Sequence, residues 1–177
     1  VEPRLLATVS ELAHPPRVIA IFRRADLPQL ERGGEPPVGL ALWRVADPGN
    51  VGTLIRSADA LGPAFVCLSA GCADPTGPKA LRGSMGAVFR VPLGSFENAP
   101  DPRVALVPAG GTPLPDLALG ERITFVLGTE RRGLPAQVVA ACAASATIPQ
   151  AASAESLNVA AAAAMLSGLD HAPRLAK

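Results

Sequence analysis

The chain contains no tyrosine, and aromatic residues make up only 3% of its 177 residues. Valine, leucine, isoleucine and alanine must therefore fill the core, which an apolar share of 49% allows. Long apolar runs are also lacking. The longest, residues 159–166, has eight residues, whereas a membrane-spanning helix needs about 20. With no signal-peptide pattern at its start, the sequence predicts one domain of ordinary size, with room for a fragment of a second, and no membrane association.

Charge of one sign is not in excess either, because 16 basic residues face 15 acidic ones. A strongly basic balance would have indicated nucleic acid by itself, so any hypothesis of RNA binding must rest on local sites. Cys67, Cys72 and Cys142 are odd in number and lack metal-ligand spacing, while His14 and His171 lie near the chain ends. We therefore expect no metal site, a reduced cytoplasmic setting, and Cys67 and Cys142 as small core residues.

Strand-like and helix-like patterns alternate along the chain. Strands are predicted over residues 17–22, 38–43, 64–68, 87–91, 104–107, 123–127 and 146–148, and helices over residues 4–13, 51–61, 79–83, 135–143 and 158–167. A polar stretch rich in glycine and proline, residues 31–37, is typical of a linker. The alternation predicts an α/β domain with a mostly parallel sheet flanked by helices, and the short apolar runs are typical of strands buried on both faces.

Three separated segments place small polar residues and glycines beside charged or amide side chains. In the first, residues 47–56, Asn50 is placed to cap the helix that follows, and Arg56 lies off that helix's apolar stripe. The free N–H groups of such a helix start also suit an anion. A simple cap and a solvated arginine explain the two residues without any function, and both interpretations stay open.

The second segment, residues 126–134, follows an apolar strand. Gly128 therefore lies at a strand's carboxyl end, where open α/β sheets bind ligands, and Glu130 comes two residues later. A glycine-rich surface loop is an equal interpretation. The third segment joins Ile148 to a predicted helix start at Ser156 and Asn158, which are also ordinary capping residues. Neither a G-x-G-x-x-G nor a Walker pattern is present, which disfavours a dinucleotide-binding oxidoreductase.

Together and in this order, the three segments resemble the motifs of the SpoU-type RNA ribose methyltransferases, which belong to the trefoil-knotted SPOUT superfamily. The resemblance covers residues 38–169. It rests on Asn50, Gly52 and Arg56, then Gly128, Glu130 and Gly133, then Ile148, Pro149, Ser156, Leu157 and Asn158, with residues 82–92 similar to the stretch between the first two motifs. Arg131, Gln150 and Ala152 depart from the family pattern, which has glycine, methionine and glycine there, and they affect detail of cofactor binding or substrate choice.

The resemblance implies an organisation for the whole chain. Residues 37–177 would form the SPOUT methyltransferase domain with a deep C-terminal trefoil knot, and residues 1–36 would be the remnant of an N-terminal RNA-binding domain plus a linker. It implies a homodimer that binds S-adenosylmethionine and methylates a ribose 2′-hydroxyl of RNA, with ribosomal RNA favoured over transfer RNA. A transfer-RNA enzyme and a non-catalytic RNA-binding knot protein are the alternatives.

The resemblance also implies roles for single residues. The implied catalytic residues are Arg56, Asn50, Glu130, Ser156 and Asn158, and the implied cofactor-binding residues are Pro108, Ala109, Gly110, Gly128, Ile148 and Leu157. Because arginine stays protonated, we expect Arg56 to clamp a phosphate and stabilise the developing alkoxide rather than to remove a proton. Lys79, Arg82, Arg90, Arg131 and Arg132 are candidate RNA-phosphate contacts, although a solvated face explains each of them as well.

Overall fold

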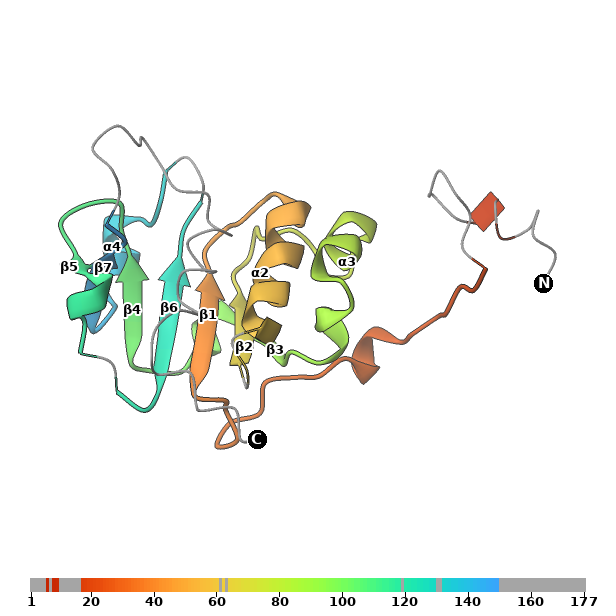
Figure 1. The fold of residues 1–177 in the computed structure, drawn as a ribbon, viewed down its shortest axis with the longest axis horizontal. Coiled ribbons are helices and arrows are strands. Elements are labelled where there is room, and N and C mark those ends of the chain that lie inside the picture. The colour runs from red at the N-terminus through yellow and green to blue at the C-terminus, as the bar shows by residue number, and fades with distance from the viewer. Residues whose placement is uncertain are drawn as a thin grey trace.

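The computed structural model describes residues 17–60, 64–118, 120–129 and 132–149, together with residues 6, 8, 9 and 62. Within them, seven parallel strands form one sheet in the order β3-β2-β1-β6-β4-β7-β5 (Figure 1). The strands are β1 Val38–Leu42, β2 Ala64–Leu68, β3 Leu93–Ser95, β4 Arg103–Leu106, β5 Thr112–Pro113, β6 Ile123–Leu127 and β7 Ala144–Thr147. The helices are α2 Pro48–Ala60, α3 Pro78–Ser84 and α4 Ala136–Ala140, with short 3-10 turns η1 Arg24–Asp26, η2 Ala87–Phe89, η3 Phe96–Asn98 and η4 Leu114–Asp116.

Most of the predicted elements are confirmed. The predicted strands 38–43, 64–68, 104–107, 123–127 and 146–148 are β1, β2, β4, β6 and β7, and the predicted helices 51–61, 79–83 and 135–143 are α2, α3 and α4, with ends that differ by no more than three residues. The mostly parallel sheet flanked by helices is likewise confirmed. The predicted helix 158–167 and most of the predicted helix 4–13 lie outside the described residues.

Two predicted strands are wrong. Residues 17–22 are irregular and exposed, with Ile21 95% accessible to solvent, because no sheet edge pairs with them and β-propensity alone does not make a strand. Residues 87–91 begin with the 3-10 turn η2, and the strand β3 starts only at Leu93. Their buried residues recur with a helical spacing, which a short apolar run does not distinguish from a strand.

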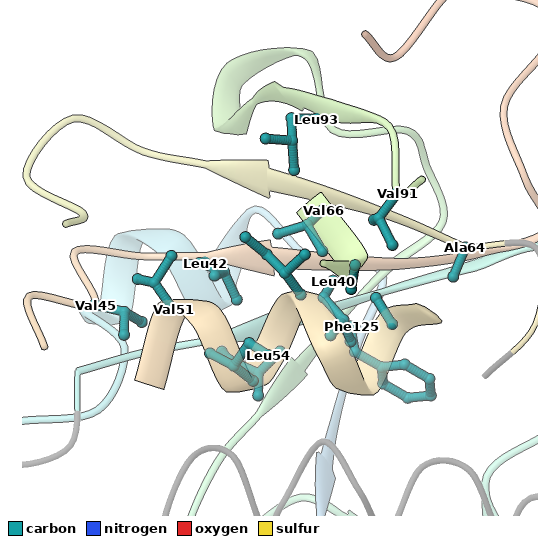
Figure 2. Packing of buried hydrophobic residues seen from close by; sticks show 14 of the residues in the cluster. Leu40, Leu42, Val45, Val51, Leu54, Ala64, Val66, Val91, Leu93 and Phe125 are labelled. Carbon is teal, nitrogen blue, oxygen red and sulfur yellow. The ribbon is translucent and has the colours of Figure 1, made fainter. Parts of the chain in front are cut away.

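The core lies on both faces of the sheet, because successive strand residues point to opposite sides. On one face Leu40 and Leu42 of β1 belong to a buried cluster with Leu54 of α2, and Figure 2 shows this cluster between the helix and the strands. On the other face Ala41 shares a cluster with Val138 of α4. The burial of β1 on both faces matches the apolar runs of the sequence.

The cysteine prediction is confirmed for Cys67, which is fully buried in the second cluster. Burial removes the thiolate from water and raises the pKa of the Cys67 thiol to about 12. Cys142 is partly buried at the edge of the same cluster. Both thiols therefore act as small apolar groups of the core.

Strand β7 lies between β4 and β5, although β4 and β5 are consecutive in the chain. The link of residues 107–111 must therefore step across β7, and Val107 N–H donates to the Ala146 carbonyl oxygen on the way, at 2.9 Å. Strand β7 comes later in the chain than both of its neighbours in the sheet, and this order fits a knotted chain. The predicted trefoil knot itself depends on residues after Pro149, which lie outside the described residues.

The segment before the linker lies against the domain. Leu30 N–H donates to the Leu93 carbonyl oxygen at 2.9 Å, and Leu93 N–H donates to that of Pro28 at 3.0 Å, so residues 28–30 extend the edge formed by β3. Further back, η1 is attached through Arg24, whose guanidinium donates to the Asp74 carboxylate at 3.2 and 3.3 Å. Among the described residues, no helix is long and apolar enough to cross a bilayer.

Candidate active site

The predicted cofactor residues come together at one edge of the sheet. Gly128 directly follows β6, residues 108–110 follow β4 after one residue, and Ile148 directly follows β7. Because β6, β4 and β7 are adjacent and parallel, their carboxyl ends lie side by side (Figure 1). This is the edge at which open α/β sheets bind ligands. Leu157, the remaining predicted cofactor residue, lies outside the described residues.

Gly128 has no room for a side chain. A Cβ placed on it would lie 2.3 Å from the carbonyl carbon and 2.4 Å from the carbonyl oxygen of Gly133. The backbone of Gly133 folds back because it exchanges two hydrogen bonds with Thr129, at 3.0 and 3.2 Å, and it adopts a φ of +61° that suits glycine. The backbone of Gly133 is therefore what packs against Gly128 at the carboxyl end of β6.

The loop after β4 is tied to the end of β7. Gly111 N–H donates to the Thr147 hydroxyl at 3.0 Å, and a Cβ on Gly111 would lie 2.7 Å from the Ala146 carbonyl carbon. Residues 108–110 project from this anchor into solvent, whereas Ile148 is buried in the core. A firm wall with an exposed, glycine-containing rim suits a nucleoside-sized ligand held by backbone groups.

The start of helix α2 differs from the prediction. Asn50 does not cap the helix; the helix begins at Pro48, and the Asp47 carboxylate accepts the Asn50 N–H at 2.8 Å. The Lys79 ammonium on α3 donates to the same carboxylate at 2.7 Å. These bonds, the one from Lys79 first, lower the pKa of Asp47. Asp47, rather than the predicted Asn50, is therefore the cap of α2.

Arg56 lies on the exposed side of α2, opposite the buried residues Val51, Leu54 and Ile55. In the part of the chain that the structure describes, its guanidinium makes no hydrogen bond or ion pair. It is thus open to a ligand, as the catalytic prediction requires. Its predicted partners Glu130, Ser156 and Asn158 lie outside the described residues.

The candidate phosphate contacts divide into two groups. Lys79 is paired with Asp47, and Arg90 is held by the Asp59 carboxylate at 2.6 and 3.1 Å, which raises the pKa of Arg90. Arg82 and Arg132 are exposed, and neither side chain is paired within the described ranges. Arg131 is not among the described residues. The unpaired arginines are therefore better placed for phosphate than the paired Lys79 and Arg90.

Two residues at this edge, Asp47 and Arg44, were not predicted. The Asp-Pro dipeptide at Asp47 is a helix-start signal that could have identified the cap. Arg44 follows β1 with a φ of +51°, and its N–H donates to the Ser69 hydroxyl at 2.8 Å. No pattern in a single sequence shows such a backbone conformation at a non-glycine residue, so Arg44 could not have been found in that way.

Comparison with known proteins identifies relatives that are RNA methyltransferases. The model of the SpoU rRNA methylase family matches residues 37–167. An uncharacterized tRNA/rRNA methyltransferase of Synechocystis is 33% identical over 172 residues, and the match covers 90% of this chain and 62% of that protein. The 23S rRNA (guanosine(2553)-2′-O)-methyltransferase RlmP of Bacillus subtilis is 32% identical over 170 residues, with 90% and 66% covered. The chain thus spans less than two thirds of the length of these curated relatives.

Solved structures agree with these relatives. The crystal structure of an AdoMet-bound rRNA methyltransferase from Sinorhizobium meliloti superposes with a TM-score of 0.70 at 34% sequence identity. The superposition covers 81% of this chain and 58% of that one.

Proposed function

The chain belongs to the SpoU rRNA methylase family, and on that premise we propose that it transfers a methyl group from S-adenosylmethionine to a ribose 2′-hydroxyl of RNA. The observation that carries the proposal is the meeting of three predicted cofactor loops at the carboxyl ends of β6, β4 and β7. Neither the individual predicted strands nor the spacing of the motifs in the sequence shows that these three loops lie at one edge of the sheet. Their meeting provides one continuous rim of backbone groups beside the start of α2, since β1 is the next strand.

The residues present fit the cofactor. The backbone at Gly128, where a side chain is excluded, and the exposed loop 108–110 would hold it, with Ile148 forming part of the wall beneath. When bound, S-adenosylmethionine supplies the methyl group, while the protein provides orientation and electrostatics. Leu157 is proposed as a further contact on the family resemblance.

Arg56 is proposed as the central catalytic residue. A ribose hydroxyl is a poor nucleophile, and its oxygen gains negative charge as the proton leaves. The Arg56 guanidinium stays protonated and is free of described partners, so it is available to bind the adjacent phosphate and to stabilise that charge. Asn50, Glu130, Ser156 and Asn158 are proposed to orient the ribose and Arg56, again on the resemblance.

Ribosomal RNA is the proposed substrate. The supporting observation is the name of RlmP, which gives a 2′-O position in 23S rRNA as that enzyme's target. Transfer RNA is the second candidate, because the Synechocystis relative is named for both RNA types. Residues 1–36 are proposed to be the remnant of an RNA-binding domain plus a linker, and the chain is proposed to act in the cytoplasm.

A homodimer is proposed on the resemblance, with the exposed side of α2 as part of the interface. Arg56 on this helix is exposed, one turn beyond Gly52, where α3 meets α2. Light scattering after gel filtration should give a mass twice the 18.0 kDa of the chain. A monomeric mass at micromolar concentration would contradict the dimer without affecting the proposed chemistry.

The catalytic proposal is tested with Arg56→Ala and a matched control, Arg122→Ala. Arg122 precedes β6, at the opposite edge of the sheet from the cofactor loops, and its side chain is 59% exposed and lies 3.6 Å from the Glu35 carboxylate. We expect Arg56→Ala to bind S-adenosylmethionine normally in calorimetry but to lose about 100-fold or more in single-turnover methyl transfer. We expect the control to match the wild type in both. A near-normal single-turnover rate in Arg56→Ala would remove Arg56 from the mechanism.

A further inference from the structure

The loop between β1 and α2 carries an arginine that the family motifs do not explain. Resting on the proposed function, we propose that Arg44 is a substrate-binding residue that contacts a phosphate of the RNA beside the active site. Arg44 is the second residue after β1, the strand that lies between β2 and β6. It therefore belongs to the same edge of the sheet as Gly128.

The backbone around Arg44 is held in an unfavourable conformation. Its φ of +51° lies in the left-handed region, which is energetically unfavourable for any residue with a side chain and suits glycine. Three hydrogen bonds fix it there, from Trp43 N–H to the Leu127 carbonyl oxygen (2.8 Å), from Arg44 N–H to the Ser69 hydroxyl (2.8 Å) and from the Ala73 N–H to the Val45 carbonyl oxygen (2.9 Å). Strain that the surroundings enforce in this way concentrates at functional sites.

The Arg44 side chain extends over the loop after β2. A Cβ placed on Gly71 of that loop would lie 3.2 Å from the Arg44 Nε and 3.7 Å from its Cγ. The side chain is nevertheless exposed. Asp74, the acidic residue of the same loop, is instead bonded to Arg24 and Thr76. The carboxylate of this loop is thus already paired with Arg24 rather than with Arg44.

Among the arginines that the structure describes, Arg44 is unusual in having both a fixed backbone and an unpaired guanidinium. Across the described ranges it makes no ion pair, whereas carboxylates pair with Arg23, Arg24, Arg90, Arg103 and Arg122. An unpaired guanidinium on a rigid backbone is suited to a phosphate, which it binds through two parallel hydrogen bonds. Such a contact positions the RNA without reading its sequence.

Arg44→Gly separates this role from a structural one. It removes the side chain and also relieves the left-handed strain, so we expect a thermal midpoint no lower than that of the wild type. We expect the Kd for RNA in filter binding, and the KM for RNA in methyl transfer, to rise about 5- to 10-fold at low salt. The slope of log Kd against log salt should fall by about 0.7 to 0.9. Arg44→Lys should recover part of the affinity, and Arg122→Ala should leave it unchanged.

Several results would overturn the inference. Unchanged RNA affinity and salt slope in Arg44→Gly would do so, and so would a weaker Kd for S-adenosylmethionine with unaltered RNA binding, which would place Arg44 on the cofactor. If the wild type binds RNA but transfers no methyl group, the proposed function fails while filter binding still decides the role of Arg44. Normal methyl transfer with identical KM values for RNA in wild type and Arg44→Gly would reject the role of Arg44 and leave the proposed function intact. Absence of RNA binding by the wild type would reject both.

Discussion

Asp47 holds together the starts of two helices. Its carboxylate caps α2 through the Asn50 N–H and receives the Lys79 ammonium from α3. These bonds lower the pKa of Asp47 below the ordinary value of 3.8. A carboxylate whose pKa is lowered by folding stabilises the protein above the ordinary pKa, and this stabilisation is lost as the pH falls through the lower, folded value.

Asp47→Asn should therefore lower the thermal midpoint at pH 7. The difference from the wild type should shrink as the pH falls from 4 towards 2, because the wild-type carboxylate then becomes neutral as well. Thermal melts across this pH range measure it. Asp26→Asn is the control, since Asp26 makes only an exposed pair with Arg23. A difference that stays constant down to the lowest pH would show that charge at Asp47 is not what stabilises α2.

Gly128 lies at the proposed cofactor site, and its surroundings leave no room for a side chain. Gly128→Ala would press a methyl group onto the backbone of Gly133, so we expect a loss of stability of about 2–3 kcal/mol, as in overpacked cores. We also expect weaker binding of S-adenosylmethionine in calorimetry. Gly34→Ala is the matched control, because no atom lies within 4 Å of a Cβ there. Normal cofactor affinity in a folded Gly128→Ala protein would contradict the proposed seat.

The sequence predicted the place of some single residues, such as Gly128, but not that of others, such as Asp47 and Arg44. Gly128 was found because it follows a clear apolar strand, and the structure gives it the expected place at a carboxyl end. The predicted cap Asn50 is wrong and Asp47 is the cap, because the proline and glycine after Asp47 are typical of a turn as well as of a helix start. Arg44 depends on a φ value imposed by two distant segments, the end of β6 and the loop after β2, which local sequence does not encode.

At the scale of elements, helices α2 and α3 meet through glycines. A Cβ on Gly52 would lie 2.3 Å from the Ala80 carbonyl oxygen and 2.9 Å from the Ser84 nitrogen. The two backbones therefore approach as closely as glycine permits. This contact positions Arg56 on α2 relative to Lys79 and Arg82 on α3, so the geometry of the proposed RNA surface depends on it.

Gly52→Ala should separate the two helices. Since the obstructing atoms belong to backbone, we expect a destabilisation of about 2–3 kcal/mol, measured by urea unfolding, together with reduced methyl transfer. Gly120→Ala should leave both unchanged, because its added Cβ would only reach an ordinary contact of 3.8 Å. Unaltered stability in Gly52→Ala would mean that α2 and α3 adjust without cost, and the link between their packing and activity would be lost.

Elements were predicted well where their apolar residues are buried by neighbours on both sides. The buried strands β1, β2 and β6 were found within one residue, because a short apolar run between turns has few other uses. Residues 17–22 are also largely apolar but have no neighbouring strand, and they are irregular. Strand β5 was missed because two residues, one a proline, carry no periodicity.

At the scale of the whole molecule, the cofactor edge arises from pairings between distant segments. Alternating patterns predicted a parallel α/β sheet, but the order in which β4 lies between β6 and β7 is a property of the folded chain. Only the family resemblance placed Gly128, residues 108–110 and Ile148 in one site before the structure showed them at one edge. Catalytic residues Glu130, Ser156 and Asn158 remain predictions, as does the knot.

The proposed function is tested most directly by incubating the wild-type chain with tritiated S-adenosylmethionine and total RNA, separating ribosomal from transfer RNA, and digesting each with alkali. Alkaline cleavage needs a free 2′-hydroxyl, so a methylated ribose survives in an alkali-resistant dinucleotide. We predict label in such dinucleotides from ribosomal RNA, and none with Arg56→Ala. Label that alkali reduces entirely to mononucleotides would place the methyl group on a base, and absence of label despite cofactor binding would contradict catalysis by this chain.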